Sequence, residues 1–303
     1  MRTLNADETR RLLAYGPLAD ELAGVLRDRK AGRAYAPPRL AVPLAGGGVL
    51  LLMPAADQQI AITKLATVHT GNSVADLPAV QADVIVMEAA TGHRLLTLDG
   101  NMVTARRTAA LSMLAARLLA VEPSGPLLVV GGGTQARSHV EAFVEGLGVR
   151  EVYTFSRSLQ AAEELAAHAR TLAEGVEARP VADVSEVLAR VSLVVTATTS
   201  SVPVLPAGAV LRDDVFVVAV GAYTPQMAEL PPDLVLRSRV YVDTLEGAQS
   251  DAGDLIQAGV DWERVTSLQD ALDLPPLTGG PVIFKSVGNA LWDLAAAKLA
   301  LRG

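Results

Sequence analysis

A glycine-rich turn carries the clearest chemical signal in the sequence. The apolar, β-type run Leu127–Val130 enters the turn Gly131-x-Gly133-x-x-Ala136, and a helical pattern follows at once. In a dinucleotide-binding fold the first glycine permits a tight turn, the second lets the backbone approach a pyrophosphate, and the small third residue lets the helix pack on the strand. The free N–H groups at the helix N-terminus then favour the anion. The strand–turn–helix context favours a bound dinucleotide over a plain tight turn.

The residues after the next strand indicate which dinucleotide binds. The strand-like run Glu151–Phe155 is followed by Ser156 and Arg157. NAD-binding folds usually carry Asp or Glu near this point, roughly 20 residues after the glycines, to hold the ribose 2′-hydroxyl. A guanidinium binds a 2′-phosphate through two parallel hydrogen bonds, whereas a carboxylate would repel it. The sequence therefore favours NADPH, with NADH as the second choice; the alternative is that Arg157 is an ordinary surface arginine.

Three cations in the first part of the chain have positions suited to binding an anion. Arg39 follows the rigid pair Pro37-Pro38, Lys64 interrupts an apolar strand, and Arg107 lies where a turn enters a helix. Each of them alone is more often a surface or snorkelling side chain. A domain that accompanies a cofactor domain must hold the substrate against the nicotinamide. Together the three cations therefore point, weakly, to an anionic substrate.

The bulk composition excludes several classes of protein. The chain has 303 residues, a formal net charge of -7 and no cysteine, and 50% of its residues are hydrophobic. These values exclude disulfides and cysteine–metal sites, and they argue against nucleic acid or an anionic membrane as a partner. The four histidines lack the spacing of zinc ligands, the first residues do not read as a secretion signal, and no apolar run reaches the roughly 20 residues that span a bilayer. We therefore expect a cytoplasmic protein without a metal site.

The elements that position these residues fall into two expected domains. Residues 1–122, with a return at 285–303, read as α+β, with a helix over 9–31 broken at Gly16-Pro17 and another over 104–121. After the boundary Pro123–Pro126, residues 123–284 alternate strand and helix as in a doubly wound parallel sheet. Strands are predicted over 42–44, 49–53, 59–67, 83–88, 95–98, 127–130, 151–155, 192–197, 215–220 and 239–243. Further helices are predicted over 134–147, 158–173, 184–190, 245–258 and 286–302, and the last is expected to pack on the first domain.

Short stretches along nearly the whole chain match one known family. They are, in chain order, Met53-Pro54; Lys64 with Asn72; Thr91-Gly92 with Leu98-Asp99-Gly100; Thr104 with Arg107-Thr108-Ala109-Ala110; Gly131-x-Gly133-x-Gln135-Ala136; Thr196-Ala197-Thr198; Gly221 with Pro225 and Glu229-Leu230; Val242-Asp243; and Phe284-Lys285-Ser286-x-Gly288. By these stretches the chain resembles the ornithine cyclodeaminase/mu-crystallin family. Together they are far more specific than the glycine turn alone.

The resemblance implies a fold and a set of roles. The implied fold is a Rossmann doubly wound parallel sheet plus an α+β domain for substrate binding and dimerisation, and the implied assembly is a homodimer. The family's active-site lysine falls on Lys64 and its carboxylate-binding arginines on Arg39 and Arg107. The remaining expected cofactor contacts are the Arg107-Thr108 pair near the phosphates, Gly131, Gly133, Thr134 and Gln135 at the pyrophosphate, and Ala197 and Thr198, which would face the cofactor by position alone.

Two departures from the family pattern bear on the reaction. The pattern of the ornithine cyclodeaminases has a glutamate two residues before the Met-Pro pair, where this chain has Leu51. It has an aspartate at the position where this chain has Tyr223. Those carboxylates hold the side-chain amine of ornithine, and an unpaired ammonium in a closed site would cost several kcal/mol. Their loss argues against the cyclodeaminase reaction. It points to the family's other branch, whose members reduce ketimines, several of them with NADPH.

We therefore expect NAD(P)H-dependent reduction of small cyclic ketimines, namely Δ1-pyrroline-2-carboxylate to L-proline and Δ1-piperideine-2-carboxylate to L-pipecolate. Arg39 and Arg107 would clamp the carboxylate. Lys64 would donate a proton to the imine nitrogen or position a water that does so. The neighbouring arginines are expected to lower the pKa of this lysine.

Three alternatives stay open from the sequence. They are reductive amination of a keto acid, as in members of alanine dehydrogenase type; residual cyclodeaminase activity; and NADPH-dependent binding without catalysis, as in a crystallin. Four further residues carry less weight. A structural or surface role is favoured for His69, a turn-forming role is equally good for Asn72, Asp243 ends a strand without an assigned ligand, and Ser286 reads as a helix N-cap.

Overall fold

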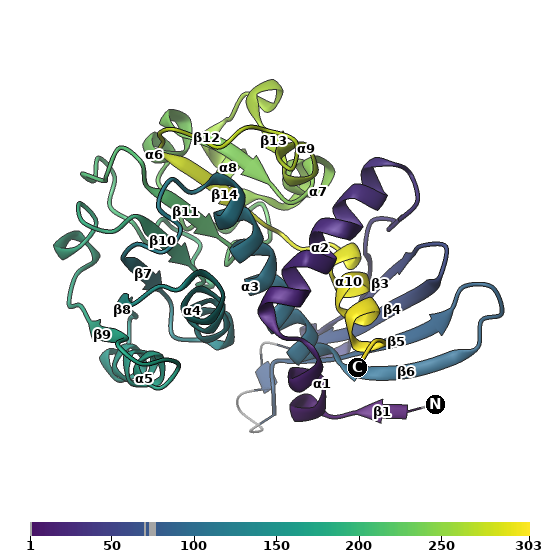
Figure 1. The fold of residues 1–303 in the computed structure, drawn as a ribbon. Helices are drawn as coiled ribbons and strands as arrows, with labels where there is room; N and C mark the ends of the chain where they lie inside the picture. Colours follow the sequence, from purple (N-terminus) through teal and green to yellow (C-terminus); the bar gives the residue numbers. More distant parts are fainter. Residues whose placement is uncertain (1, 70, 73–76) are drawn as a thin grey trace. The chain divides into compact units, whose positions relative to one another are not determined.

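The computed structural model describes residues 2–69, 71–72 and 77–303 and divides into two compact units (Figure 1). The first unit is Met1–Thr108 with Asn289–Gly303, and the second is Ala109–Gly288. The division falls inside helix α3 (Gly100–Leu119) and just before helix α10 (Ala290–Ala300). The domain bounds expected from the sequence, 1–122 with 285–303 and 123–284, stay a prediction.

The first unit is built on a mostly antiparallel sheet of six strands. Its strand order is β1-β6-β5-β4-β3-β2, and only the pairing of β1 with β6 among them is parallel. The strands are β1 (Arg2–Leu4), β2 (Leu40–Pro43), β3 (Val49–Ala56), β4 (Ile60–Val68), β5 (Val80–Glu88) and β6 (Arg94–Asp99). The helices are α1 (Ala6–Leu12), α2 (Tyr15–Lys30), α10 and the first part of α3.

The α10 helix packs against α2 and against β3 and β4. Burial alternates along β4, as expected for a strand with one face under helices. On this strand Ile60, Ile62, Lys64 and Ala66 are buried, whereas Leu65 is exposed. Successive side chains of a strand point to opposite faces. One face of the sheet therefore packs under helices, and Lys64 is on that face.

The helical start of the first unit differs in two details from the prediction. Asn5 and Glu8 form a capping box at the start of α1, which begins at Ala6, before the predicted start at residue 9. The break between α1 and α2 lies at Leu13 and Ala14, so the expected break at Gly16-Pro17 was wrong. Pro17 lies in the first turn of α2, where an N–H group has no intrahelical partner in any case and proline is tolerated.

The second unit has an eight-stranded sheet in which every assigned pairing is parallel. Its order is β13-β12-β14-β11-β10-β7-β8-β9. The strands are β7 (Leu127–Val130), β8 (Glu151–Phe155), β9 (Glu177–Pro180), β10 (Leu193–Thr196), β11 (Phe216–Ala219), β12 (Arg239–Val242), β13 (Thr266–Ser267) and β14 (Val282–Lys285). The helices are the second part of α3, α4 (Thr134–Leu147), α5 (Leu159–Arg170), α6 (Pro232–Arg237), α7 (Leu245–Asp251), α8 (Gly253–Ala258) and α9 (Leu268–Ala271). The predicted doubly wound parallel sheet is thus confirmed.

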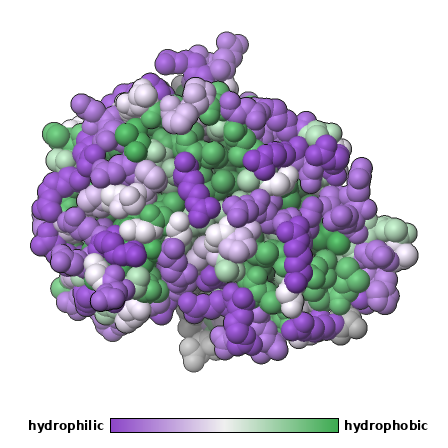
Figure 2. All heavy atoms as spheres, viewed as in Figure 1, coloured by the Kyte–Doolittle hydropathy of each residue, from purple (hydrophilic) through white to green (hydrophobic). Residues whose placement is uncertain are grey.

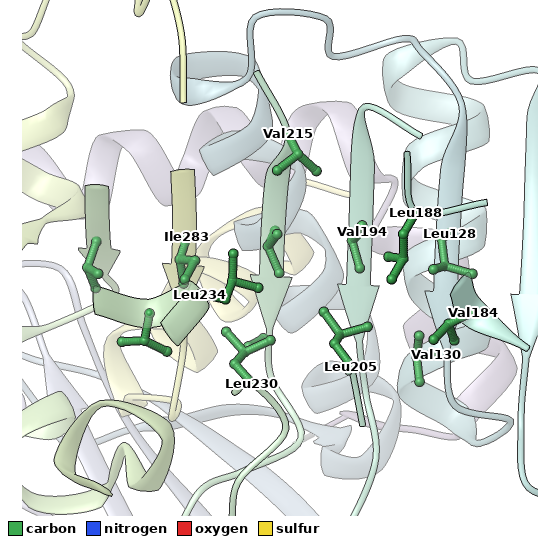
Figure 3. Close-up of a cluster of buried hydrophobic side chains, with 14 of the residues drawn as sticks. Leu128, Val130, Val184, Leu188, Val194, Leu205, Val215, Leu230, Leu234 and Ile283 are labelled. Carbon is green, nitrogen blue, oxygen red and sulfur yellow. The ribbon is translucent and has the colours of Figure 1, made fainter. Parts of the chain in front are cut away.

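Short apolar strands form the core of this sheet. β7, β10, β11 and β14 are buried along their whole length, as expected for strands of a parallel sheet covered on both faces. Figure 3 shows Leu128, Val194, Val215 and Ile283 from these strands and their flanks side by side with Leu234 of α6. The core holds the strands rigidly, and their carboxyl ends carry the loops described below.

Three helix predictions need correction, two in the second unit and one at α10 of the first. The helix over 184–190 is only a 3₁₀ turn at Val184–Glu186, which ends at Val187, where the φ of -126° is not helical. The helix over 245–258 is split at Ala252 into α7 and α8. The helix over 286–302 begins only at Ala290. Strands β9, β13 and β14 were not predicted.

The surface in view mixes hydrophobic and hydrophilic side chains, with hydrophobic ones gathered in patches between hydrophilic ones (Figure 2). Among the helices of the described residues, none is both long enough and apolar enough to span a membrane.

Candidate active site

Lys64 is held on the covered face of the first unit's sheet. In β4 it pairs with Met53 of β3 on one side and with Val84 of β5 on the other. Its relative exposure is 4%. A buried ammonium needs a partner because the loss of hydration is costly. The neighbours of Nζ therefore decide what this lysine does.

The partner of Lys64 is Asp293, which the sequence analysis did not predict. Asp293 lies in the first turn of α10, a helix that begins at the cap Asn289. Its Oδ2 lies 2.8 Å from Nζ of Lys64, and its Oδ1 accepts a hydrogen bond of 3.2 Å from Nε of Arg107. Asp293 is fully buried. One carboxylate thus joins two of the three cations predicted from the sequence.

The surroundings of Lys64 lower the pKa of its ammonium group. Burial is the largest cause that lowers the pKa of Lys64; the charge of Asp293 raises it, and the charges of Arg107 and Arg39 lower it. The net direction is downward. The two arginines act in the expected direction, but burial acts more strongly than either. All three predicted cations are therefore close enough to interact within the first unit.

Arg107 has spare hydrogen-bonding capacity. Its side chain is 6% exposed, and its Nη1 is buried with no hydrogen-bond partner among the described residues. An unpaired buried guanidinium nitrogen costs free energy unless a ligand accepts its hydrogen bond. Thr104, one turn before Arg107 on α3, accepts a weak contact of 3.4 Å from Nζ of Lys64. Arg107 and Lys64 thus present donors suited to a carboxylate and a basic nitrogen.

The hydroxyl of Thr108, unlike Nη1 of Arg107, already has a hydrogen-bond partner. Its hydroxyl donates a 2.7 Å hydrogen bond to the carbonyl of Thr104 within α3, a common arrangement for a threonine in a helix. Its role at the cofactor phosphates stays a prediction.

In the glycine turn of the second unit, Gly131 and Gly133 have different backbone conformations and different surroundings. Gly131 has φ +135°, and a Cβ there would lie 2.5 Å from the carbonyl oxygen of Ala197. Its glycine is therefore required by the fold itself. Gly133 has an ordinary φ of -93° as the N-cap of α4, and a Cβ there would have no atom within 4 Å. No described residue would meet a Cβ at 133, so the space beside this backbone is open to a ligand.

The start of α4 has the features that a pyrophosphate needs. Gly133 has no side chain that would cap the N–H groups of the first turn, which begins with Thr134 and Gln135. Free N–H groups and the helix dipole favour an anion at this point. Ala136 is fully buried, as expected for the residue that lets the helix pack closely. The residues present therefore fit a dinucleotide.

Ser156 and Arg157 lie at the carboxyl end of the neighbouring strand. β7 and β8 are parallel, with Val130 opposite Phe155, so the residues after both strands meet at one edge of the sheet. The Ser156 hydroxyl oxygen lies 3.1 Å from the position of a Cβ on Gly132, and Arg157 is exposed. The structure thus brings the predicted selector beside the glycine turn.

Glu229 fixes the loops that follow β10 and β11. One of its oxygens accepts hydrogen bonds from the backbone N–H and the hydroxyl of Thr198, at 2.7 and 2.9 Å. The other accepts one of 2.7 Å from the backbone N–H of Gly221. Burial raises the pKa of Glu229, against the lowering influence of Lys285 and these donors. The sequence analysis assigned Glu229 no role, although it stands in one of the family stretches.

Two more buried carboxylates, Asp254 and Asp243, brace the same edge of the sheet. Asp254 lies 2.7 Å from Nζ of Lys285 and accepts the backbone N–H of Leu230. Asp243 accepts hydrogen bonds from the Ser286 hydroxyl and from the backbone N–H of Gly288. Ser286 therefore donates to Asp243 and is not a helix N-cap, because Asn289 caps α10. Asp243 binds the chain itself.

The other residues singled out from the sequence have local roles. Asn72 donates to the carbonyl of Pro78, as a turn-forming residue does, and the His69 ring lies against Gly48. Leu51 pairs with Ala66, two residues from Lys64 along β4, and so shares its face of the sheet. Tyr223 is 44% exposed. The face around Lys64 therefore carries an apolar side chain, Leu51, at the position where the cyclodeaminase pattern described above has a glutamate.

The whole of this architecture corresponds to one family model. The model of the ornithine cyclodeaminase/mu-crystallin family matches residues 2–301. The chain belongs to this family. The resemblance found from the short sequence stretches is thereby confirmed.

Two curated members of the family are similar over nearly the full length. Delta(1)-pyrroline-2-carboxylate reductase 1 of Burkholderia multivorans is 42% identical over 297 residues, covering 98% of this chain and 94% of that protein. The Delta(1)-pyrroline-2-carboxylate/Delta(1)-piperideine-2-carboxylate reductase of Azospirillum brasilense is 39% identical over 296 residues, with the same coverage of 98% and 94%. Among solved structures, an archaeal alanine dehydrogenase dimer with bound NAD gives a TM-score of 0.89 at 25% identity, covering 100% of this chain and 95% of that one.

Proposed function

We propose that the protein reduces small cyclic ketimines, with NADPH preferred as the hydride source and NADH accepted. The substrates are Δ1-pyrroline-2-carboxylate and Δ1-piperideine-2-carboxylate, and the products are L-proline and L-pipecolate. The observation that carries the proposal is the cluster of Lys64, Arg107 and Asp293, with one nitrogen of Arg107 left for a ligand. The names of the two reductases that are about 40% identical support the same substrate class.

The residues of the first unit supply binding and a proton. Arg39 and Arg107 bind the substrate carboxylate as charge-assisted hydrogen-bond donors. Lys64, with its lowered pKa, gives a proton to the imine nitrogen, which makes the ring carbon a better hydride acceptor. The apolar Leu51, on the same face of the sheet, suits ring methylenes and offers no counter-charge to a second ammonium. This is why we favour reduction over the cyclodeaminase reaction.

Most of the residues assigned to the dinucleotide belong to the second unit; Arg107 and Thr108 belong to the first. Gly131, Gly133, Thr134 and Gln135 would hold the pyrophosphate, Ser156 and Arg157 the 2′-phosphate, and Ala197 and Thr198 the nicotinamide end; Arg107 and Thr108 are assigned to the phosphates by family resemblance. When bound, the reduced nicotinamide supplies the hydride. The archaeal neighbour with bound NAD supports a nicotinamide dinucleotide in this fold.

We also propose that two copies associate through the uncovered face of the six-stranded sheet. Leu40, Leu52 and Leu65 stand opposite one another on β2, β3 and β4, and Leu40 and Leu65 are 57% and 38% exposed. A row of exposed leucines on a sheet face is typical of an interaction surface. A second copy is the favoured occupant because the archaeal neighbour is named as a dimer.

The deciding experiment follows the loss of reduced-cofactor absorbance with each ketimine and with NADPH or NADH. Turnover with either ring supports the proposal. Turnover only with pyruvate and ammonia would replace it by an amino-acid dehydrogenase, the activity named for the archaeal neighbour. Tight NADPH binding without turnover of any of these substrates would indicate a binding protein of crystallin type.

A further inference from the structure

Asp293 divides its two oxygens between two side chains that the proposed reaction uses. Oδ2 lies 2.8 Å from Nζ of Lys64, and Oδ1 accepts from Nε of Arg107 at 3.2 Å. This leaves Nη1 of Arg107 without a partner among the described residues. A carboxylate that occupies one edge of a guanidinium fixes the orientation of the whole planar group. The free nitrogen of Arg107 is therefore held in one place.

The surroundings of Asp293 are otherwise unsuited to a charge. Its chain neighbours on α10, Trp292 and Leu294, are fully buried, and burying a lone carboxylate here would be costly. A buried ion pair is seldom a net source of stability compared with apolar side chains. Stability alone is thus a poor reason for Asp293, and the two cations that it contacts suggest a functional one.

We propose that Asp293 is the positioning residue of the reduction: it holds Lys64 as an ammonium with Nζ fixed near Thr104, and it orients Arg107 so that Nη1 is left for the substrate carboxylate. This inference rests on the proposed ketimine reduction. It assigns to α10 the task of preparing both the proton donor and the carboxylate clamp.

The proton balance shows why the charge of Asp293 matters. The hydride adds to the ring carbon of the C=N bond, and the proton from Nζ of Lys64 goes to the ring nitrogen, so that the C=N double bond becomes a single bond and the product is a secondary amine. Lys64 is left neutral and takes a proton from water before the next turnover. The charged groups that act on Nζ are Asp293 from α10, Arg107 from α3 and Arg39 from the segment before β2. Of these, only Asp293 favours the ammonium.

The test compares Asp293→Asn with Asp57→Asn. Asparagine at 293 keeps the shape and removes the charge. Asp57 is a matched control, because it too is an aspartate paired with a lysine, Lys298 at 2.6 Å, but its ion pairs do not include Lys64 or Arg107 among the described residues. The pH dependence of kcat is measured for both variants. Independently, the protein without cofactor or substrate is treated with an amine-reactive acylating reagent over a range of pH. Peptide mass spectrometry then measures the acylation of Lys64 at each pH.

The expected result is a fall in kcat of roughly 10²-fold for Asp293→Asn. The alkaline limb of its profile and the acylation of Lys64 should both move to lower pH by about 1 unit or more. Asp57→Asn should leave both profiles in place. An unchanged acylation profile in a folded Asp293→Asn variant would overturn the inference.

A second variant separates charge from mere packing. Asp293→Glu keeps the charge, so it should leave the acylation profile of Lys64 within a few tenths of a pH unit of the parent even where kcat falls; a shift as large as that expected for asparagine would count against the inference. If the parent turns over no ketimine, the proposed function fails, and the acylation measurement still decides whether Asp293 sets the charge of Lys64. If Asp293→Asn does not fold, this comparison with glutamate decides the matter.

Discussion

Nζ of Lys285, the last residue of β14, lies 2.7 Å from Oδ2 of Asp254 on α8, and both side chains are fully buried. Asp254 in turn accepts the backbone N–H of Leu230, the neighbour of Glu229, whose carboxylate fixes the loops after β10 and β11. The ion pair is therefore part of a series of contacts, through Asp254 and Glu229, that hold the loops at the carboxyl edge of the parallel sheet in place.

Replacing Lys285 by methionine should destabilise the protein strongly. The variant leaves Asp254 buried without its cation, which typically costs about 3 to 5 kcal/mol. Urea unfolding followed by circular dichroism measures the loss. Lys298→Met, which breaks a more exposed pair with Asp57, should cost clearly less, and adding Asp254→Asn to Lys285→Met should restore part of the stability. Equal losses for the two lysine variants would contradict this account.

The two glycines of the turn should respond differently to alanine. Gly131→Ala forces a Cβ to within 2.5 Å of the Ala197 carbonyl at φ +135°, so we expect a loss of roughly 1 to 3 kcal/mol in stability. Gly133→Ala meets no atom of the protein and should melt like the parent, yet it should weaken NADPH binding by about tenfold or more because its methyl occupies the space of the pyrophosphate. Thermal melting and fluorescence titration with NADPH measure the two effects. Unchanged NADPH affinity in Gly133→Ala would refute the assignment of this turn.

Arg157→Gln should change the choice of cofactor. Loss of the guanidinium removes a charge-assisted contact to the 2′-phosphate, which we expect to raise the Kd of NADPH by about tenfold or more while that of NADH stays the same. Arg264→Gln removes another exposed arginine of the same unit and serves as the control. Equal effects on both cofactors would show that Arg157 is not the selector.

His139 should remain neutral far below neutral pH. Burial lowers its pKa from 6.5 to about 4, and its ring links the Gln135 carbonyl to the Ser112 hydroxyl. The folded-state pKa lies below the unfolded one, so the stabilisation is complete above about pH 6.5 and is lost as pH falls towards 4, by up to about 3 kcal/mol. Titration of the four histidines by NMR checks the pKa. Titration of His139 near 6.5 would disprove it.

A charge on the uncovered sheet face should separate the proposed dimer. Leu65→Asp places a carboxylate in the row of exposed leucines, where a second copy would have to bury it at a high desolvation cost. Sedimentation velocity should then show the monomer, whereas Leu274→Asp, at an exposed leucine of the second unit, should leave the association unchanged. A parent protein that sediments as a monomer would remove the dimer proposal.

The sequence reveals features whose signal is local and misses those that depend on distant partners. The turn from Gly131 to Ala136 and the buried strands around it follow from spacing and hydrophobicity alone. Lys64 stands out because a lysine conflicts with its apolar strand. Asp293, by contrast, lies in an ordinary Ala-rich helix, and no local pattern shows that α10 brings it to Lys64.

Strand β14 was missed for a related reason. Val282–Lys285 is short, follows a Gly-Gly-Pro turn and ends in a charged residue, so that its pattern is weak. It lies between β11 and β12 in the sheet, and the buried Lys285 is accommodated only because Asp254 comes from a distant helix. Tertiary pairing, which periodicity does not show, decides both the strand and its lysine.

The place of α10 in the chain has a consequence for how the protein is made. During synthesis, residues 2–108 leave the ribosome long before α10, and the second unit, which is continuous in sequence, emerges between them. Since domains generally fold as they emerge, the nascent first sheet must wait with its future helix-covered face open and Lys64 without Asp293. The α10 helix, which packs against β3 and β4, covers this face only after it has been synthesised. The growing polypeptide is thus expected to depend on chaperones until α10 has been translated.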